Sequence, residues 1–474
     1  MIGREEELRM LDLDYHKEES QFVVVYGRRR IGKTYLVREK FYDQFAFFHT
    51  GLREGGLKEQ LEAFRISLKN YGDIRCPRLK SWLEAFDRVN KLIDSQPEGR
   101  KVIFIDELPW MDTPRSNLVS ALEYFWNSEL SVRRQKDVFL VVCGSATSWI
   151  VENLLHNRGG LHNRLTDQIW LRPFTLAECE KYVRSLGIEM SRAEICEAYM
   201  IFGGVPYYWS LLRADKSLAQ NIDELCFSPR GKLTDEFDYL YASLFRNAEP
   251  HLKIVQALAA RRYGMTREEI LNETGLKNGG NFKKILDDLV RCDFVRQSNA
   301  RKKRNRDAFF QLVDCFTIFH HAFMTGRAAG DAHFWSNSLE APALASWKGL
   351  SFERLCVLHT EEIKRALGIS GIRTEEYSWR TVSEDETLKG AQIDLVIERA
   401  DGNINLCEMK YTDGPFELDA RESEKLQHRK LAFKSENSLN KSCRLTLISP
   451  NGIKSNKYSH LIQNVITVGD LFRE

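Results

Sequence analysis

The chain has 474 residues, of which 43% are hydrophobic and 29% are charged. This composition is typical of a folded globular protein and excludes a disordered or membrane-embedded chain, and the length corresponds to two to four domains. No stretch approaches the roughly 20 consecutive apolar residues that span a bilayer, and the charged N-terminus does not have the pattern of a signal peptide. We therefore expect a cytoplasmic protein without membrane partners.

The net charge is only +2, but the basic residues are unevenly distributed. Between His251 and Arg306, fourteen Lys or Arg residues stand against six Asp or Glu residues, a local net charge of +8. This asymmetry predicts an anionic partner for the segment. The ten cysteines are scattered singly, without a CxxC pair. They indicate neither a zinc site nor a disulfide framework, and we expect small buried side chains.

Short apolar runs alternate with helical patterns in residues 1–172, which predicts an α/β domain with a parallel sheet. The three clearest runs are Gln21–Tyr26, Val102–Ile105 and Val138–Cys143. From residue 173 to 250 the pattern becomes helical, and Thr175 and Glu178 have the spacing of a capping box. We interpret this second segment as a helical lid.

Residues 251–325 predict a winged helix-turn-helix, since three helices with a turn at Gly275 precede two strands. The expected elements are the helices Leu252–Arg261, Arg267–Thr274 and Gly280–Cys292 and the strands Phe294–Ser298 and Ala308–Val313. Around Gly326–Ala345 the apolar period is lost, which indicates a domain linkage.

Residues 340–474 predict a separate α/β domain. Its expected elements are a helix near Phe352–Leu367, two strands, Gln392–Glu398 and Asn405–Tyr411, around a turn at Asp401–Asn403, and a late strand Arg444–Ser449.

The segment from Gly27 to Thr34 fits the pattern GxxxxGK[ST] and lies between a predicted strand and a helical run. In a P-loop, glycines let backbone N–H groups point at phosphates, and the following helix adds its positive dipole end. Lys33 should reach the β- and γ-phosphates of ATP, and Thr34 should bind Mg²⁺. The nucleotide-binding residues that the motif predicts are Gly27, Arg28, Arg29, Arg30, Ile31, Gly32, Lys33 and Thr34, with the arginines interpreted as solvated loop residues rather than catalytic ones.

The run Lys101–Glu107 supplies a second part of the nucleotide site, because an apolar strand ending in Asp-Glu brings carboxylates to the sheet edge where the P-loop opens. We expect Asp106 to hold Mg²⁺ through water and Glu107 to orient or deprotonate the attacking water. An ordinary strand with a polar end is the alternative interpretation.

With these motifs, nearly the whole chain resembles the AAA-related STAND-type ATPases of archaea and bacteria. The segment Ile2–Leu8 is similar to the family's hhGRExEL motif, which packs near the adenine. Cys143–Trp149 resembles the sensor strand, which implies that Ser145 senses the γ-phosphate. The resemblance implies an ATPase fold with a helical lid.

Two further segments carry the same resemblance. Gly159–Thr166 resembles the part of the family that provides an arginine finger, which implies a catalytic role for Arg164, with Arg158 as its rival and a surface salt bridge as the alternative. Gly203–Tyr207 is similar to the GxP element of the lid, which implies that Pro206 lies against the base; a helix-breaking turn is the alternative. An arginine finger that acts in trans would require a homo-oligomer.

The predicted winged helix carries two basic groups that could contact DNA phosphates. The recognition helix would expose Lys277, Asn278, Asn281, Lys283 and Lys284, and the wing carries Arg296, Arg301, Lys302, Lys303, Arg304 and Arg306. A winged helix that serves only as a spacer or a protein contact is the alternative.

The strands around the Asp401–Asn403 turn resemble the core of PD-(D/E)xK nucleases over about residues 340–474. The resemblance implies that Asp394 and Glu408 hold Mg²⁺ or Mn²⁺ and that Lys410 positions water. A three-residue turn, in which paired residue numbers sum to 802 or 804, sets Asp394 opposite Glu408 or Lys410. A two-residue turn pairs Asp394 with Met409 instead. An inactive nuclease fold remains open.

We expect an ATP-binding and ATP-hydrolysing protein that couples nucleotide state to DNA binding and to metal-dependent DNA cleavage. The competing hypothesis is a STAND-type signalling switch whose C-terminal domain has no activity. A small-molecule kinase agrees less well, because it leaves the basic wing without a role.

Overall fold

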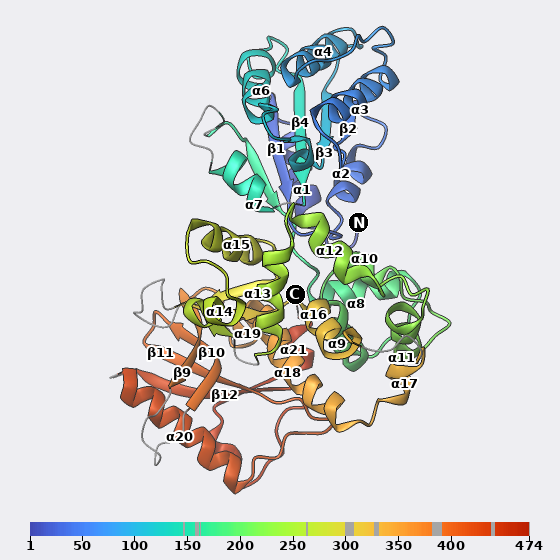
Figure 1. Ribbon diagram of the computed structural model, residues 1–474. Coiled ribbons are helices and arrows are strands. Elements are labelled where there is room, and N and C mark those ends of the chain that lie inside the picture. The colour runs from blue at the N-terminus through green and yellow to red at the C-terminus, as the bar shows by residue number, and fades with distance from the viewer. Residues whose placement is uncertain are drawn as a thin grey trace. The chain divides into compact units, whose positions relative to one another are not determined.

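The computed structural model describes residues 1–145, 147–156, 161, 163–261, 264–298, 308–326, 331–381, 391–437 and 441–473 (Figure 1). The chain forms two compact units. The first unit contains Met1–Pro173 and Leu240–Ala248, and the second contains Phe174–Tyr239 and Glu249–Glu474. Among the described residues, no helix combines the length and apolarity that crossing a membrane requires.

The first unit is built on a five-stranded parallel sheet with the strand order β2-β3-β4-β1-β5. The strands are β1 (Gln21–Tyr26), β2 (Phe45–Thr50), β3 (Lys101–Asp106), β4 (Val138–Gly144) and β5 (Asp167–Trp170). Every residue of the three central strands is buried. Continuous apolar runs form such strands because both faces of the sheet are covered. The predicted parallel sheet is thus confirmed.

Helices cover this sheet on both faces, and two apolar clusters lie between the layers. Phe22, Val24 and Tyr26 of β1 belong to one cluster, and Val23 and Val25 belong to the other, as the two-residue period of a strand requires. The helices are α1 (Glu5–Tyr15), α2 (Lys33–Phe41), α3 (Leu57–Asn70), α4 (Trp82–Asp94), α5 (Leu108–Met111), α6 (Leu118–Tyr124) and α7 (Thr147–Ile150), with π-helical turns at Phe125–Leu130 and Val151–Leu155.

The second unit begins with short helices. They are α8 (Leu176–Ser185), α9 (Arg192–Phe202), α10 (Pro206–Trp209), α11 (Leu218–Ile222), a π-helical turn at Asp223–Phe227 and α12 (Glu236–Leu244), which crosses the boundary between the units. The capping box predicted at the start of α8 is confirmed. The Thr175 hydroxyl accepts a hydrogen bond from the backbone N–H of Glu178, whose carboxylate accepts one from the backbone N–H of Thr175.

The next part contains three helices and a small antiparallel sheet with the order β6-β8-β7. The elements are α13 (Glu249–Ala259), β6 (Met265–Thr266), α14 (Arg267–Thr274), α15 (Gly280–Arg291), β7 (Val295–Ser298) and β8 (Phe309–Leu312). The wing residues Arg301, Lys302, Lys303, Arg304 and Arg306 lie outside the described residues.

Arg296, which the sequence predicts as part of the basic wing, is not freely exposed. Arg296 is half-buried on β7, and burial lowers the pKa of its guanidinium, while the nearby carboxylate of Glu376 acts in the opposite direction. Glu376 belongs to β9 (Thr374–Thr381), a strand of the C-terminal sheet. Arg296 therefore faces a neighbouring sheet, which takes it out of any DNA-facing wing.

The domain linkage predicted at Gly326–Ala345 is also wrong in part, because this segment contains α17 (Phe334–Asn337) and the start of α18 (Pro342–Leu358). Trp335 is fully buried, and its backbone N–H donates a hydrogen bond of 2.8 Å to Asp223. Burial of this one large aromatic ring orders the segment, although its apolar residues do not repeat with a helical period. Before it, α16 (Cys315–Phe319) continues into a π-helical turn at His320–Met324.

The helix predicted near Phe352–Leu367 is divided into α18 and α19 (Thr360–Ala366) at His359. Nδ1 of His359 lies 2.8 Å from the carbonyl oxygen of Leu355, and Nε2 accepts a hydrogen bond of 3.1 Å from the backbone N–H of Leu176. Because His359 is buried and accepts at Nε2, its ring is neutral, and burial lowers its pKa. The ring thus joins α18 to the first turn of α8.

The C-terminal part contains a five-stranded sheet with the order β13-β12-β11-β10-β9. The remaining elements are β10 (Ala391–Arg399), β11 (Asn403–Met409), α20 (Ala420–Asn437), β12 (Ser442–Ser449), a 3-10 turn at Ser459–Leu461, β13 (Asn464–Thr467) and α21 (Val468–Leu471). Strands β9 to β11 are antiparallel, whereas β11, β12 and β13 run parallel. All ten cysteines of the chain are buried, as expected.

Candidate nucleotide site and a second charged cluster

The loop between β1 and α2 requires glycine at two positions. Gly27 has a φ of 145°, and a Cβ there would lie 2.3 Å from the carbonyl oxygen of Leu171 and 2.6 Å from Cδ1 of Ile31. Gly32 has a φ of 92° and forms the N-cap of α2. Both angles favour glycine, so the loop has the curled backbone that lets N–H groups converge on a phosphate.

Lys33 is the first residue of α2, and its side chain is buried in this loop. Its ammonium donates hydrogen bonds to the carbonyl oxygens of Gly27 at 3.1 Å and Arg28 at 2.9 Å, and to the hydroxyl of Ser145 at 2.9 Å. These oxygens are neutral acceptors. Phosphate oxygens would bind the same ammonium more strongly, because hydrogen bonds between two charged groups are about twice as strong.

Thr34 and Asp106 are the residues that could hold a metal ion. The Thr34 hydroxyl donates a 2.9 Å hydrogen bond to one carboxylate oxygen of Asp106, while the other oxygen accepts from the backbone N–H of Glu107 at 2.9 Å and from the thiol of Cys143. Burial raises the pKa of Asp106, with the carboxylate of Glu107 adding to the effect and Cys143, Thr34 and Lys33 opposing it. A hydroxyl next to a carboxylate is a donor set that Mg²⁺ accepts.

Glu107 follows β3 in a left-handed backbone conformation, with φ 49° and ψ 43°. This conformation costs about 1–2 kcal/mol in a residue with a Cβ. The side chain is held on both oxygens, because Oε1 accepts a 2.7 Å hydrogen bond from the Ser145 hydroxyl and Oε2 accepts a 3.2 Å bond from the Ser145 backbone N–H. The strained backbone and these two bonds fix the direction of the Glu107 carboxylate.

Ser145 therefore connects the ends of three elements. Its hydroxyl accepts from Lys33 at the start of α2 and donates to Glu107 after β3, while Ser145 itself follows β4. The hydroxyl donates its proton to Glu107, and one of its lone pairs accepts the hydrogen bond from Lys33. A movement of either Lys33 or Glu107 therefore alters the hydrogen bond between Ser145 and the other residue.

Two residues of this site were not assigned roles from the sequence. Cys143 contacts Asp106, and the signal that could have found it is its place near the end of a strand that neighbours β3. Arg4 lies in the predicted N-terminal motif, and its Nη2 donates to the carbonyl oxygens of Ile31 at 3.2 Å and Arg172 at 2.8 Å. Arg4 thereby ties the P-loop to the segment after β5.

The remaining predicted residues of this site lie as follows. Arg28 is buried in the loop, Arg29 is half-buried, and Arg30 has a φ of 68°. Arg164 is exposed. Pro206 belongs to the second unit, where it begins α10. Ser145, Asp106, Glu107 and Lys33 are the predicted residues that the structure brings together.

A second cluster of charged side chains lies where the first half of β10 meets the end of β11. Paired residues such as Leu395 and Cys407 have residue numbers that sum to 802, and continuing this register by one residue sets Asp394 opposite Glu408. The first of the two three-residue-turn alternatives is therefore the observed one. Lys410 is two residues beyond Glu408, so its side chain belongs to the same face, and its Nζ lies 3.0 Å from the Glu408 carboxylate.

Helix α20 adds two residues to this cluster that the sequence did not reveal. Arg429 forms an ion pair of 2.5 Å with Glu408, and Glu422 lies 3.5 Å from Nζ of Lys410. Burial alone would lower the pKa of Lys410, but the carboxylates of Glu408 and Glu422 outweigh it, and the pKa is raised. The seven-residue spacing of Glu422 and Arg429 on one helix face was the available signal. Among the described residues, no three His, Cys, Asp or Glu side chains form a group suited to a metal ion.

Comparison with known proteins agrees with the first site. Residues 1–212 match a protein family described as an ATPase domain predominantly from Archaea. A protein of Methanocaldococcus jannaschii, described as uncharacterized, is 23% identical over 333 residues, which make up 68% of this chain and 68% of that protein. The chain has an α/β P-loop NTPase-like fold with a parallel sheet, and the family match supports a nucleotide-binding ATPase.

Two solved structures are also similar. A Walker-type ATPase of Pyrococcus abyssi has a TM-score of 0.48 and 16% sequence identity, over 68% of this chain and 96% of that chain. The ORC2 protein of Aeropyrum pernix, in its ADPNP–ADP complexes, has a TM-score of 0.44 and 12% identity, over 68% of this chain and 92% of that chain.

Proposed function

We propose that this chain binds and hydrolyses ATP at the site formed by the P-loop, Asp106, Glu107 and Ser145. The observation that carries the proposal is the chain of hydrogen bonds from Lys33 through the Ser145 hydroxyl to Glu107. It links the residue that binds the β- and γ-phosphates to the residue that would orient the attacking water. Generic strand ends do not converge in this way.

In this mechanism, the Lys33 ammonium exchanges the carbonyl oxygens of Gly27 and Arg28 for phosphate oxygens. The backbone N–H groups of the loop and the N-terminus of α2 bind the remaining phosphate charge. Thr34 and Asp106 would hold Mg²⁺, which neutralises phosphate charge when it is bound. Ser145 responds to the γ-phosphate through Lys33, and Glu107 then accepts the proton of the attacking water.

Two variants test this proposal. Lys33→Ala should abolish tight ATP binding in a calorimetric titration, because the ammonium is replaced by a methyl group. Glu107→Gln should retain ATP binding and stop phosphate release, because an amide keeps the shape but does not take a proton. Unchanged ATP affinity in the first variant contradicts the P-loop assignment, and normal turnover in the second removes Glu107 from its role.

Arg164 supports an extension of this proposal to an oligomer. Its side chain is exposed in the single chain, as an arginine finger that acts on a neighbouring subunit would have to be. Measuring the mass in solution with and without nucleotide tests the extension. Arg164→Ala should reduce turnover while leaving ATP affinity unchanged. Full turnover in this variant would mean that Arg164 is an ordinary surface residue without a catalytic role.

We further propose that nucleotide state is coupled to DNA binding by the three-helix segment around α15. Five polar or basic residues at and just before α15 are exposed: Lys277, Asn278, Asn281, Lys283 and Lys284. Its buried positions, Phe282, Ile285 and Leu286, face the core. An amphipathic helix with a basic outer face suits the phosphates of a DNA groove.

Salt dependence tests this coupling. Replacing both Lys283 and Lys284 with Ala should weaken DNA binding and lower the slope of log K against log salt by about two, one for each lost phosphate contact. An unchanged slope would leave α15 as a spacer or protein contact, and Arg261→Ala, at an exposed position after α13, is the control.

For the C-terminal cluster, two functions compete, and separate observations favour each. The register that sets Asp394 opposite Glu408 and the nearby Lys410 support metal-dependent cleavage of DNA, with Mg²⁺ or Mn²⁺ on the carboxylates and Lys410 beside the nucleophile. The ion pairs that Arg429 and Lys410 form with Glu408 favour the alternative, a signalling switch with an inactive domain, because both carboxylate oxygens are already engaged.

Cleavage assays on single-stranded, linear and supercoiled DNA with Mg²⁺ and with Mn²⁺ separate these functions. An active site predicts that Lys410→Ala loses cleavage but retains metal and that Asp394→Ala loses both. If the wild-type protein cuts none of these substrates and binds no Mn²⁺, the signalling function replaces the nuclease.

A further inference from the structure

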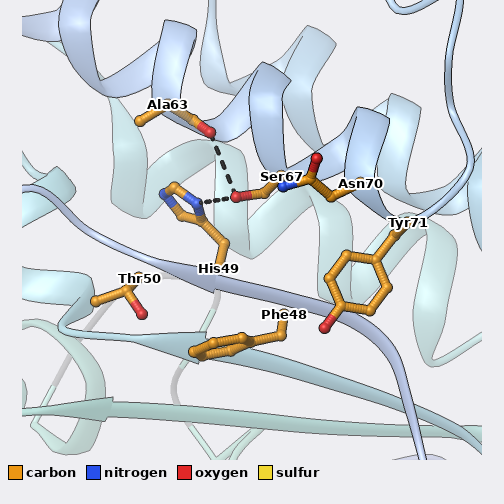
Figure 2. Close-up of a pocket in the computed structure, with 7 residues that line it drawn as sticks. All are labelled: Phe48, His49, Thr50, Ala63, Ser67, Asn70 and Tyr71. Atoms are coloured by element: carbon orange, nitrogen blue, oxygen red, sulfur yellow. Dashed lines mark hydrogen bonds between the residues drawn. The ribbon is translucent and has the colours of Figure 1, made fainter.

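A pocket of about 560 Å³ lies beside β2, at the edge of the parallel sheet in the first unit (Figure 2). Strand β2 and helix α3 form its walls. The residues that line it are Phe48, His49, Thr50, Ala63, Ser67, Asn70 and Tyr71. The four from α3 and its C-cap have the three- and four-residue spacing of a single helix face. The volume is within the range of about 300–1,000 Å³ that is usual for small-molecule sites.

His49 is a buried polar side chain of this pocket with one nitrogen left over. Its Nδ1 lies 2.9 Å from the Ser67 hydroxyl, which in turn donates to the carbonyl oxygen of Ala63 at 3.3 Å. Nε2 has no hydrogen-bond partner within the described part of the chain, although the residue is only 2% exposed. An unpaired buried polar atom costs about 1–3 kcal/mol. Nε2 is too buried for a molecule in the pocket to reach, so His49 contributes a wall of the pocket rather than a hydrogen-bonding group.

The other lining residues combine rings with hydrogen-bonding groups. Figure 2 shows the Tyr71 ring extending from α3 toward β2, where Phe48 lies, and the amide of Asn70 and the hydroxyl of Thr50 at the margins of the same space. Asn70 and Thr50 are exposed, whereas the two rings are half-buried. A flat molecule can therefore contact the rings while its edge reaches the polar groups.

The chemistry of the walls excludes two simpler ligands. A purely apolar molecule would cover the Asn70 amide and the Thr50 hydroxyl, which are exposed to water, without giving them partners. A bare anion would find no charged partner among the lining residues, because burial lowers the pKa of His49 to about 4. An uncharged heteroaromatic ring with donors and acceptors at its edge satisfies both the rings and the polar groups.

A cation lies beside this pocket. The guanidinium carbon of Arg38 is 6.0 Å from the centroid of the Phe48 ring. Its charge also opposes the burial that raises the pKa of Tyr71. Arg38 is exposed on α2, one turn after Thr34. A phosphate attached to a bound ring would be favoured on this side.

We propose that this pocket binds a nucleobase, with its ring against Phe48 and Tyr71 and its polar edge toward Asn70 and Thr50. The base belongs either to a free nucleoside phosphate or to an unpaired nucleotide of a nucleic-acid strand. The site is separate from the P-loop and takes its ligand in addition to ATP.

Strand pairing couples this pocket to the nucleotide site, a consequence that rests on the proposed ATPase function. In the register of β2 and β3, His49 pairs with Ile105 and Thr50 pairs with Asp106. The backbone N–H of Gly51 also donates a 2.9 Å hydrogen bond to the carbonyl oxygen of Asp106. A base that shifts the end of β2 therefore acts on Asp106, and ATP turnover changes when the pocket fills.

Calorimetry with the P-loop saturated by ADP and Mg²⁺ tests binding without any catalytic readout. We expect one additional site per chain for at least one of the four nucleoside 5′-monophosphates or for a short single-stranded oligonucleotide. Binding of the monophosphates alone identifies a free nucleotide as the ligand, and binding of the oligonucleotide alone identifies a strand. Tyr71→Ala should weaken this binding about 5- to 150-fold, the usual effect of losing one base–aromatic stack.

Three further variants complete the test. Tyr71→Phe keeps the ring and should retain affinity, and Asn70→Ala should lose part of it. Ile66→Ala is the matched control, because this residue is 50% exposed on α3 and does not line the pocket. Three results overturn the proposal: no probe binds at millimolar concentration, the Tyr71→Ala and Ile66→Ala proteins bind alike, or ADP blocks all binding and Tyr71→Ala weakens ADP itself. The last result would make the pocket part of the P-loop site.

Discussion

Replacing Ser145 with Ala removes the hydroxyl that links Lys33 to Glu107. Two hydrogen bonds are lost, one of 2.9 Å to an ammonium and one of 2.7 Å to a carboxylate, and each involves a charged group. Such bonds contribute about 1.5–3 kcal/mol each. The backbone N–H of Ser145 still donates to Glu107 at 3.2 Å, so part of the positioning survives.

We therefore expect the equivalent of one such bond to be lost from the transition state, which lowers kcat by about 10- to 150-fold. Affinity for ADP should change less than about threefold, within the scatter of a single weak contact, because ADP lacks the γ-phosphate that Ser145 senses through Lys33. Steady-state phosphate release measures kcat, and a fluorescent ADP analogue measures affinity. Ser145→Thr keeps a hydroxyl and should retain most of the activity.

An exposed serine provides the matched control. Ser131→Ala lies outside the site and should have wild-type kcat. If Ser145→Ala hydrolyses ATP at the wild-type rate, the hydrogen-bond chain has no catalytic role. If its ADP affinity falls as far as its kcat, the hydroxyl supports the loop as a whole rather than the chemical step.

Three other predictions concern both units. Gly27→Ala should abolish ATP binding and lower the Tm, because its φ of 145° and the carbonyl oxygen 2.3 Å from the new Cβ both oppose a side chain; wild-type affinity would contradict the close approach. Burial lowers the pKa of His359, so the folded state binds fewer protons than the unfolded state below about pH 6.5. The stabilisation that neutral His359 provides should therefore be fully present above that pH and decrease as the pH falls. The Tm, measured from pH 7.5 to 5.5, should fall more in the wild type than in His359→Gln. Arg429→Met frees one oxygen of Glu408 and should raise Mn²⁺ affinity about fivefold, for an ion pair worth about 1 kcal/mol; Lys425→Met on the same helix should leave it unchanged, and equal effects of the two variants would refute a local role.

The central strands of the first sheet could be predicted because burial on both faces leaves a continuous apolar run, as in Gln21–Tyr26 and Val138–Gly144. The edge strand Phe45–Thr50 was not predicted, since it ends in His49 and Thr50 and has no period of its own. Trp335 shows the same limit, because one buried ring ordered a segment whose composition indicated a linkage.

The residues of the candidate sites also differ in whether the sequence could predict them. The residues of the P-loop are consecutive in the chain, so a motif is enough to find them. Cys143 and Arg429 act through partners 37 and 21 residues away, and only the pairing of strands and the packing of α20 bring those partners near. The register of β10 and β11 depended on turn geometry, which the sequence around Asp401 left open between two turn lengths.

That register has a consequence for how this family of sequences can vary. Substitutions in the turn at Asp401–Asn403 leave the pairing of β10 with β11 intact. A single inserted or deleted residue there would shift the sum of paired numbers by one, turn Asp394 and Glu408 to opposite faces and separate them in one step. Lineages that keep the charged cluster should therefore keep the length of this turn and the glycine at Gly402, whose φ is 84°, while its other residues change, and a relative with a longer or shorter turn should also have lost the carboxylates.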